Sequence, residues 1–411
     1  MITPAYAPTA TERVLPRLAL DFTTATLDPR VTVTRALNTA TVRNANGSIS
    51  IVNADLPRFD YLNGVCRGLL IEETRTNLLS NSVFSGAVAG TPGTAPTGWL
   101  DLVATGTIAS VSAGIYAAGN AIRITTSGTR RSFYKVQALS ANTTYSYSLT
   151  VTVNSTPVAG YPRIQDCMFL ANGPAGSTVT YLLNGAAATA GTAIPNGQTS
   201  TIVAIIAVGA TAGNVEVRWG LSVTSTVDGD VTIQMPQLEA GAFATSYIPT
   251  TTTSLTRNAD VVSMTGTNFS NWYNADEGAF VVEASTPPSG TYAPIIQVDS
   301  GTANNRIVVG QTAGGFADYS VVSSGSAQAS FQTTTIANST ASIAGVYKTD
   351  SFARAVNGEA ASTDNLGLVP TVNNLKIGSN LTPVYFNRHI RKIRFYSQRI
   401  LNAEATAFSK L

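Results

Sequence analysis

The stretch MPQLEAGAFATSYIPTTTTSLTRNADVV occupies residues 235–262 and separates two long regions of β-pattern. Its first part continues a strand that starts at Val231, and its last part starts a new alternating pattern at Leu255. Between them, Pro249 precedes four threonines. Because proline fixes φ and threonine side chains tolerate solvent, we expect an exposed, extended connection here. The stretch therefore predicts a boundary between two β-domains.

The composition favours an all-β protein with several domains. A chain of 411 residues is long enough for two or three domains. Only 12% of its residues are charged, about half the usual share, and its polarity comes from Thr, Ser, Asn and Gly. Uncharged β-formers with many glycines are typical of β-modules rather than of helical proteins.

Charge and cysteine content exclude several classes of partner. A net charge of +2 gives no concentrated basic surface, so we expect no nucleic acid partner. Cys66 and Cys167 fall in different predicted domains, which predicts two small buried hydrophobes rather than a disulfide or metal cluster.

The first 20 residues lack the features of a signal peptide and no apolar run reaches 18 residues. We therefore expect synthesis in the cytoplasm without export, and no membrane insertion.

The N-terminal fifth combines an extended arm with two hairpins. Residues 1–17 contain three prolines among small residues, which predicts an arm. Asn46-Gly47 and Asn63-Gly64 are hairpin turns. Residues 69–71 read as a buried strand bordered by Glu72, Glu73 and Arg75, which are costly to bury unless paired. We interpret these charges as ties to a neighbouring module and give less weight to a paired-carboxylate catalytic site.

The two remaining regions carry the periodicity of β-sandwiches. Residues 142–154 alternate, with Tyr145, Tyr147 and three aliphatic residues on one face. Residues 277–396 contain further strands, and residues 401–411 form a short helix with Asn402 as its N-cap. The predicted fold is all-β: a small N-terminal module (1–80) followed by two antiparallel jelly-roll sandwiches (81–250 and 251–411).

Catalytic motifs are missing from the sequence, so we expect no enzymatic activity. The single histidine, His389, lies between Arg388 and Arg391, and neighbouring positive charge lowers the pKa of an imidazole. No nucleophile elbow, phosphate loop, zinc spacing or dinucleotide fingerprint is present. Hydrolysis of a glycan by two carboxylates stays as the weaker alternative. We interpret the basic run from Arg388 to Arg399 as a solvated face, ahead of contact with an acidic neighbour or an anionic glycan.

Sugar binding would need exposed rings beside amide and carboxylate groups. The candidate rings are Trp99, Tyr134, Tyr161, Trp272, Tyr273, Tyr292 and Tyr319. No cofactor and no metal are expected, although loop oxygens in the last domain could hold Ca²⁺. The aspartates that could serve are Asp276, Asp299, Asp318 and Asp364.

Three motifs carry a resemblance to known proteins. Residues 57–79 contain PRFDY, GLLIEE and TRTNLL, and this block resembles a small N-terminal module of bacteriophage tail and virion proteins. QLEAG (237–241) followed by ATSYIPT (244–250) resembles the end of a carbohydrate-binding-module-like jelly roll in phage structural proteins. TRNAD (256–260) and the ending around Phe386–Tyr396 are similar to a concanavalin-A-like (laminin-G-like) domain. The expected docking motif consists of Arg58, Phe59, Tyr61, Glu72, Glu73, Arg75 and Asn77.

The resemblance implies a bacteriophage structural protein exposed on the virion. We expect a fibre or tail-associated component that displays glycan-binding sandwiches for attachment to a host-surface glycan. The alternative is a capsid-decorating or head-fibre protein with a structural role. Its partners would be other virion proteins and two further copies in a homotrimer, because multivalent display strengthens weak sugar binding. Residues 1–80 would attach to the particle and residues 255–411 would face outward.

Overall fold

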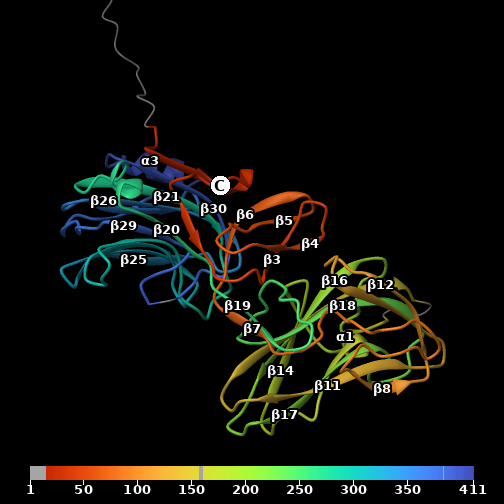
Figure 1. Ribbon diagram of the computed structural model, residues 1–411. Coiled ribbons are helices and arrows are strands. Elements are labelled where there is room, and N and C mark those ends of the chain that lie inside the picture. Colours follow the sequence, from red (N-terminus) through yellow and green to blue (C-terminus); the bar gives the residue numbers. More distant parts are fainter. Residues whose placement is uncertain (1–14, 157–160, 383) are drawn as a thin grey trace, which may run out of the picture. The chain divides into compact units, whose positions relative to one another are not determined.

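The structure, a computed structural model, describes residues 15–156, 161–382 and 384–411 (Figure 1). Within these residues the named strands pair antiparallel, and the helices are short. The predicted all-β class is confirmed. No helix in the described part of the chain combines the length and hydropathy needed to cross a membrane. Most of the predicted arm, including Pro4 and Pro8, lies outside the described residues.

The chain forms two compact units, each assembled from separate segments. Unit 1 contains the described residues of 1–35, 55–73 and 260–411, and unit 2 contains 36–54 and 74–259. The chain therefore passes from one unit to the other four times. This differs from the predicted succession of three domains, because residues 15–80 form no body of their own and supply strands to both units.

Unit 1 is a sandwich of an eight-stranded and a seven-stranded sheet. The first sheet has the order β28-β27-β26-β21-β30-β6-β5, with β1 also on β30, and the second has the order β2-β20-β29-β22-β23-β24-β25. Their bounds are β1 Leu18–Asp21, β2 Thr32–Thr34, β5 Phe59–Leu62, β6 Val65–Ile71, β20 Val261–Thr265, β21 Glu277–Ser285, β22 Ala293–Asp299, β23 Arg306–Gln311, β24 Phe316–Ser323, β25 Ser326–Thr335, β26 Thr340–Lys348, β27 Phe352–Val356, β28 Ser362–Asp364, β29 Asn374–Ile377 and β30 Arg388–Tyr396. The helices are η1 Phe22–Thr24, α2 Thr267–Ser270 and α3 Asn402–Phe408.

Early and late strands of the described chain meet inside unit 1. Leu18 is paired with Phe395, and Leu69 on β6 with Ile390 on β30. Figure 1 shows β6, coloured as an early segment, beside β30, coloured as a late one. Leu18 and Phe22 are fully buried in the same core as Phe280 and Phe395. N-terminal and C-terminal strands are therefore parts of one core.

Unit 2 is a second sandwich, of a seven-stranded and a four-stranded sheet. The orders are β15-β14-β16-β12-β18-β10-β9 and β13-β17-β11-β8, and two short pairs, β3–β4 and β7–β19, accompany them. The bounds are β3 Ala40–Arg43, β4 Ile49–Val52, β7 Arg75–Asn77, β8 Leu100–Ala104, β9 Thr107–Ala113, β10 Asn120–Thr126, β11 Arg131–Leu139, β12 Thr144–Ser155, α1 Ile164–Cys167, β13 Met168–Ala171, β14 Thr178–Leu183, β15 Ala186–Ala188, β16 Thr199–Ala207, β17 Gly213–Leu221, β18 Gly229–Ala240 and β19 Leu255–Arg257.

Side-chain alternation builds the core of unit 2 as the sequence predicts. Tyr145, Tyr147, Leu149, Val151 and Val153 on β12 are all buried in one hydrophobic core. Trp219 packs there against Phe84 and Phe133, with ring centroids 4.3 and 4.4 Å away. Both cysteines are free and buried, as expected.

One local prediction holds in part and another was wrong. The stretch after Pro249 is exposed only from Thr251 onward, because Thr250 is buried and its hydroxyl donates to the Leu79 carbonyl at 2.6 Å. The helix α3 is capped by Leu401 rather than Asn402. The Glu404 carboxylate accepts a hydrogen bond of 2.6 Å from the Leu401 backbone N–H, which satisfies one free donor of the first turn.

Candidate functional site

A polar face of the seven-stranded sheet of unit 1 carries the candidate site. Successive side chains of a strand point to opposite faces, and Ala317, Tyr319 and Val321 of β24 enter the core. Asp318 and Ser320 therefore lie on the other face. Their cross-strand partners on β25 are Gln332 and Ser330.

This face holds a pocket of about 440 Å³. Binding sites for small ligands commonly measure roughly 300–1,000 Å³, so the pocket has room for a short saccharide. It is lined by Tyr292, Gln297, Ala303, Arg306, Asp318, Ser320, Val321, Val322, Ala327, Ala329, Ser330, Gln332, Asn380, Leu381 and Thr382.

Asp318 is the buried acid of the pocket. Its carboxylate accepts a hydrogen bond from Gln332 Nε2 at 3.2 Å, and Tyr292 lines the same pocket. The residue has only 2% exposure, and this burial raises the pKa of Asp318, although Gln332, Tyr292, Arg354 and Arg306 oppose the rise.

Gly310 allows β22 and β23 to approach closely near Asp318. It lies opposite Asp318 on β23, and a Cβ at this position would meet the Ala293 carbonyl oxygen at 2.6 Å. The strand β22 has a register irregularity between Pro294 and Ile296, directly after Tyr292. The glycine therefore tolerates a close approach of the two backbones at this irregularity.

The structure separates the predicted aromatic candidates into core and surface. Trp99, Trp272 and Tyr319 are buried, so their predicted exposure was wrong. Trp99 packs edge-on against Trp219 and donates a hydrogen bond from Nε1 to the Asn81 carbonyl. Trp272 packs against Phe269 and Phe395. The Tyr319 hydroxyl donates to the Val346 carbonyl. The partly buried Tyr273 stacks on Tyr347 and packs against the core of unit 1.

The three remaining candidate rings are also partly exposed. Tyr292 lines the pocket of unit 1. Tyr134 lies on the four-stranded sheet of unit 2, opposite Arg218 and Leu100, and Tyr161 carries the Arg163 guanidinium 4.3 Å from its centroid.

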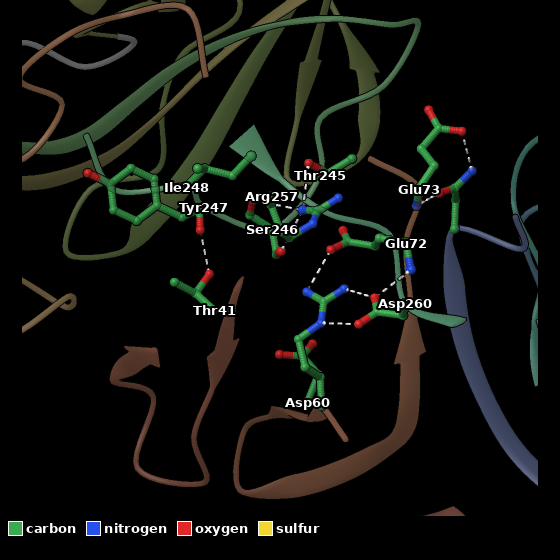
Figure 2. Close-up of polar contacts among 12 residues, drawn as sticks. Thr41, Asp60, Glu72, Glu73, Thr245, Ser246, Tyr247, Ile248, Arg257 and Asp260 are labelled. Atoms are coloured by element: carbon green, nitrogen blue, oxygen red, sulfur yellow. Dashed lines mark hydrogen bonds and ion pairs between the residues drawn. The ribbon is translucent and has the colours of Figure 1, made fainter. Parts of the chain in front are cut away.

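The expected docking motif is largely interior. Arg58 is fully buried and pairs with Glu72, whose Oε2 lies 2.7 Å from Nη1, and with both oxygens of Asp260. Figure 2 shows Glu72 and Asp260 turned toward the same guanidinium. Arg35 Nη1 lies 2.8 Å from Asp260 Oδ1, which completes a buried network of two cations and two anions. These residues hold unit 1 together, and a docking partner cannot reach them.

The other motif residues are also engaged within their own units. Glu73 accepts from Asn387 Nδ2 at 3.2 Å, and Asn387 Oδ1 in turn accepts from the Glu73 N–H. Arg75 lies over the Phe243 ring at 4.7 Å. Asn77 is fully buried and donates to the Ile248 carbonyl at 2.9 Å. Phe59 and Tyr61 are half-buried on β5.

The motif at residues 237–257 closes a loop inside unit 2. Gln237 Oε1 accepts from the Ile248 N–H at 2.6 Å, and Glu239 accepts from both the N–H and the hydroxyl of Thr245 at 2.7 Å. Burial raises the pKa of Glu239, partly offset by those bonds. Gly241 is required because a Cβ there would overlap the Arg75 guanidinium. The motif that suggested a sugar-binding module is therefore explained by structural contacts.

His389 is buried in unit 1 and lies beside an acid. Its Nε2 lies 3.0 Å from Asp60 Oδ2, and the side chain is buried. Burial lowers the pKa of His389; the hydrogen bond with Asp60 opposes this shift, and the charge of Arg67 adds to it. The predicted direction of the pKa shift is confirmed, but its main cause is loss of solvation rather than Arg388 or Arg391.

The basic run of β30 is engaged by neighbouring groups. Arg391 Nε lies 2.5 Å from Glu283 Oε1, and Lys392 Nζ lies 3.4 Å from Glu283 Oε2. Arg394 donates to the Phe408 carbonyl, and Arg399 donates to Asn402. The run is therefore a partly solvated face whose charges also have partners within unit 1.

The described residues contain no group of three or more His, Cys, Asp or Glu side chains that could hold a metal ion. Asp299 is instead surrounded by donors, because Gln297, Asn374 and the Gly301 N–H bond its carboxylate at 2.7, 2.8 and 2.8 Å. Calcium binding by Asp276, Asp299, Asp318 or Asp364 stays a prediction.

Comparison with known proteins gives a weak likeness only. No protein-family model matches the chain, and no curated protein matches it. Among solved structures, the sialidase module CBM40 of Ruminococcus gnavus bound to α2,3-sialyllactose is similar at a TM-score of 0.30 and 15% identity, over 34% of this chain and 84% of that chain. The same module bound to α2,6-sialyllactose gives 0.29 and 14%, over 33% and 84%. Similarity this low carries no conclusion about function, which is therefore inferred from geometry.

Two residues of the pocket were predicted from the sequence, and the others were not. Tyr292 was selected as an exposed ring and Asp318 as a calcium ligand, whereas Gln297, Arg306 and Gln332 were not selected. In the sequence these residues show only the alternation of polar and apolar side chains that is typical of a strand. Any sheet face that contacts solvent shows the same alternation, so it does not identify a binding site.

We expect protonation of His389 to weaken unit 1 as the pH falls. Its pKa in the folded state lies below the value near 6.5 of an unfolded histidine. Between these two values the unfolded chain binds a proton that the folded chain does not, so the free energy of unfolding decreases as the pH drops through this window. Hydrogen exchange of β30 at pH 7.5 and 5.5 measures this loss of protection.

His389→Gln is the matched variant for this test. It is expected to show a smaller difference in β30 protection between the two pH values than the unaltered protein, because the chain contains one histidine. Equal pH dependence in both proteins would contradict the assignment.

Proposed function

We propose that this protein is a non-catalytic glycan-binding protein and that the pocket of unit 1 is its binding site. The observation that carries the proposal is the grouping of Tyr292, Asp318 and Gln332 around one hollow of the sheet. Sugar hydroxyls need paired donors and acceptors, which amides, a carboxyl group and a phenol supply. The ring of Tyr292 adds a surface for the C–H face of a pyranose.

We also propose that the protein is part of a bacteriophage virion, as a fibre or tail-associated component that attaches to a host-surface glycan. Support comes from the resemblance of residues 57–79 and 237–260 to phage structural proteins. A homotrimer is proposed on the same basis, because repeated weak sites gain roughly 10²-fold or more in avidity. The arm would attach unit 1 to the particle, since residues 18–35 belong to that unit.

Binding to immobilised glycans is expected to depend on the pocket. Gln332→Ala removes a donor to Asp318 and leaves a buried carboxyl group less satisfied, so affinity should fall about tenfold or more. Tyr292→Ala should have a similar effect. A glycan array followed by calorimetry on the bound compounds measures both variants.

Tyr134→Ala in unit 2 is the matched aromatic control and should leave binding unchanged. Loss of binding in Tyr134→Ala together with full binding in Tyr292→Ala would place the site in unit 2 and refute the proposal. Circular dichroism of each variant confirms that the sheets are retained.

The proposed absence of catalysis has a direct test. Incubation of the purified protein with polysaccharides that it binds is expected to release no reducing ends above a heat-inactivated sample. Release that disappears on Asp318→Asn would contradict the proposal and identify Asp318 as an acid of a hydrolase.

A further inference from the structure

We propose that the pocket of unit 1 selects saccharides that carry a carboxylate group and takes up a proton when it binds them. This inference rests on the proposed glycan-binding function and adds the chemical class of the ligand. Three features of the pocket carry it: an arginine without an acidic partner, a ring of polar groups, and a buried acid beside them.

Arg306 is the cation of the pocket lining. The hydrogen bond recorded for its side chain goes from Nη1 to the Ala303 carbonyl, and the described residues supply no carboxylate within ion-pair distance. Lys376 and Arg391 of the same unit, in contrast, lie 3.9 Å from Asp299 and 2.5 Å from Glu283. Arg306 is thus available for a ligand anion, and the planar guanidinium binds carboxylates through two parallel hydrogen bonds.

The remaining lining matches a polyhydroxylated ligand rather than a simple anion. Gln297, Gln332 and Asn380 provide amides, and Ser320 and Ser330 provide hydroxyls. Val322, Ala327 and Leu381 add apolar surface. A lone phosphate or acetate ion would leave most of these groups without contact, whereas an acidic sugar would engage both kinds of surface.

Asp318 makes the preference depend on pH. The groups around it are Arg306 on β23, Gln332 on β25, Arg354 on β27 and Tyr292 before β22. Burial raises the pKa of Asp318, and an anionic ligand in the same pocket would raise it further, because two like charges disfavour ionisation of the acid. Binding of an acidic saccharide is therefore coupled to protonation of Asp318, and its affinity should increase as the pH decreases.

Calorimetry on the full-length protein tests the inference. The probes are a galacturonic acid trisaccharide and sialyllactose as two carboxylate sources, with a galactose trisaccharide and lactose as neutral counterparts. We expect at least one acidic probe to bind about tenfold more tightly than its counterpart, and at least about threefold more tightly at pH 5.5 than at pH 7.5. If both acidic probes bind, the carboxylate group itself is the feature that the pocket recognises. If only one binds, that probe shows which kind of acidic sugar the pocket selects.

Variants distinguish the charge effect from loss of structure. Arg306→Gln should abolish the preference for the acidic probe, Arg306→Lys should retain part of it, and Asp318→Asn should remove the pH dependence. Lys410→Gln removes one exposed positive charge of unit 1 outside the pocket and should change nothing. Thermal unfolding of each variant shows whether the fold is intact.

The outcomes separate the two proposals. Equal affinity for acidic and neutral probes, with binding lost in Gln332→Ala, would overturn the acidic preference and leave the proposed function in place. Failure of all saccharides, on the array and in solution, would overturn both.

Discussion

Replacing Asp260 with alanine is expected to lower the free energy of unfolding of unit 1 by about 3–5 kcal/mol, because removal of one member of a buried ion network leaves the others uncompensated. Asp260 bonds Arg58 and Arg35, and its Oδ2 also accepts from the Glu72 N–H at 2.9 Å. The two arginines have 0% and 1% exposure, so water cannot replace the lost carboxylate. Urea unfolding monitored through the fluorescence of Trp272, which lies in the core of unit 1, measures the change.

Asp28→Ala is the matched control for this experiment. Asp28 also pairs with an arginine, at 2.7 Å, but both partners are partly exposed, and exposed pairs contribute about 1 kcal/mol or less. Trp272→Phe identifies the fluorescence transition that belongs to unit 1, because Trp99 and Trp219 report on unit 2. A similar small effect of Asp260→Ala and Asp28→Ala would show that the network is not needed for stability.

Removing both segments of unit 2 is expected to leave a protein that folds as unit 1. The cut ends lie close together within that unit: the Asp55 N–H donates to the Arg35 carbonyl at 3.1 Å, and the Asp260 N–H donates to the Glu72 carbonyl at 3.0 Å. A short glycine-containing turn can therefore join residue 35 to 55 and residue 73 to 260. The entropy of closing loops this short is small. Circular dichroism and a cooperative urea transition of Trp272 fluorescence measure folding.

A second deletion provides the contrast. Removal of residues 1–35 alone takes away Leu18, Leu20 and Phe22, which are buried in the core of unit 1, and should prevent that unit from folding. An unfolded chain after the double excision, or a folded unit 1 after the N-terminal deletion, would contradict the division into units.

Strands were predictable from this sequence, but their partners were not. The alternation from Tyr145 to Val153 and the turn at Asn63-Gly64 depend on neighbouring residues, so period and turn chemistry identify them. The pairing of Leu18 with Phe395 joins residues at opposite ends of the chain, and no local pattern encodes it. For this reason the predicted order of three domains differs from the two interleaved units.

The candidate site was predictable only in part for a related reason. Asp318 and Gln332 meet because β24 and β25 pair in a particular register, which a shift of one residue would reverse. The selection of Trp99 and Trp272 as exposed rings failed because both follow loop-like segments yet pack on other aromatic rings in the cores. Local sequence gives the chemistry of a side chain, whereas burial depends on contacts made by distant segments.

The four passages of the chain between the units set an order of events on the ribosome. Unit 2 has its last residue at position 259, so it can fold before the final third of the chain is translated. Strands β1 and β6 are synthesised early, but β30, with which both pair, emerges last. The nascent chain therefore carries the apolar side chains of Leu18, Leu20 and Phe22 without their final neighbours for most of translation, and a chaperone that holds such segments would raise the yield of folded protein.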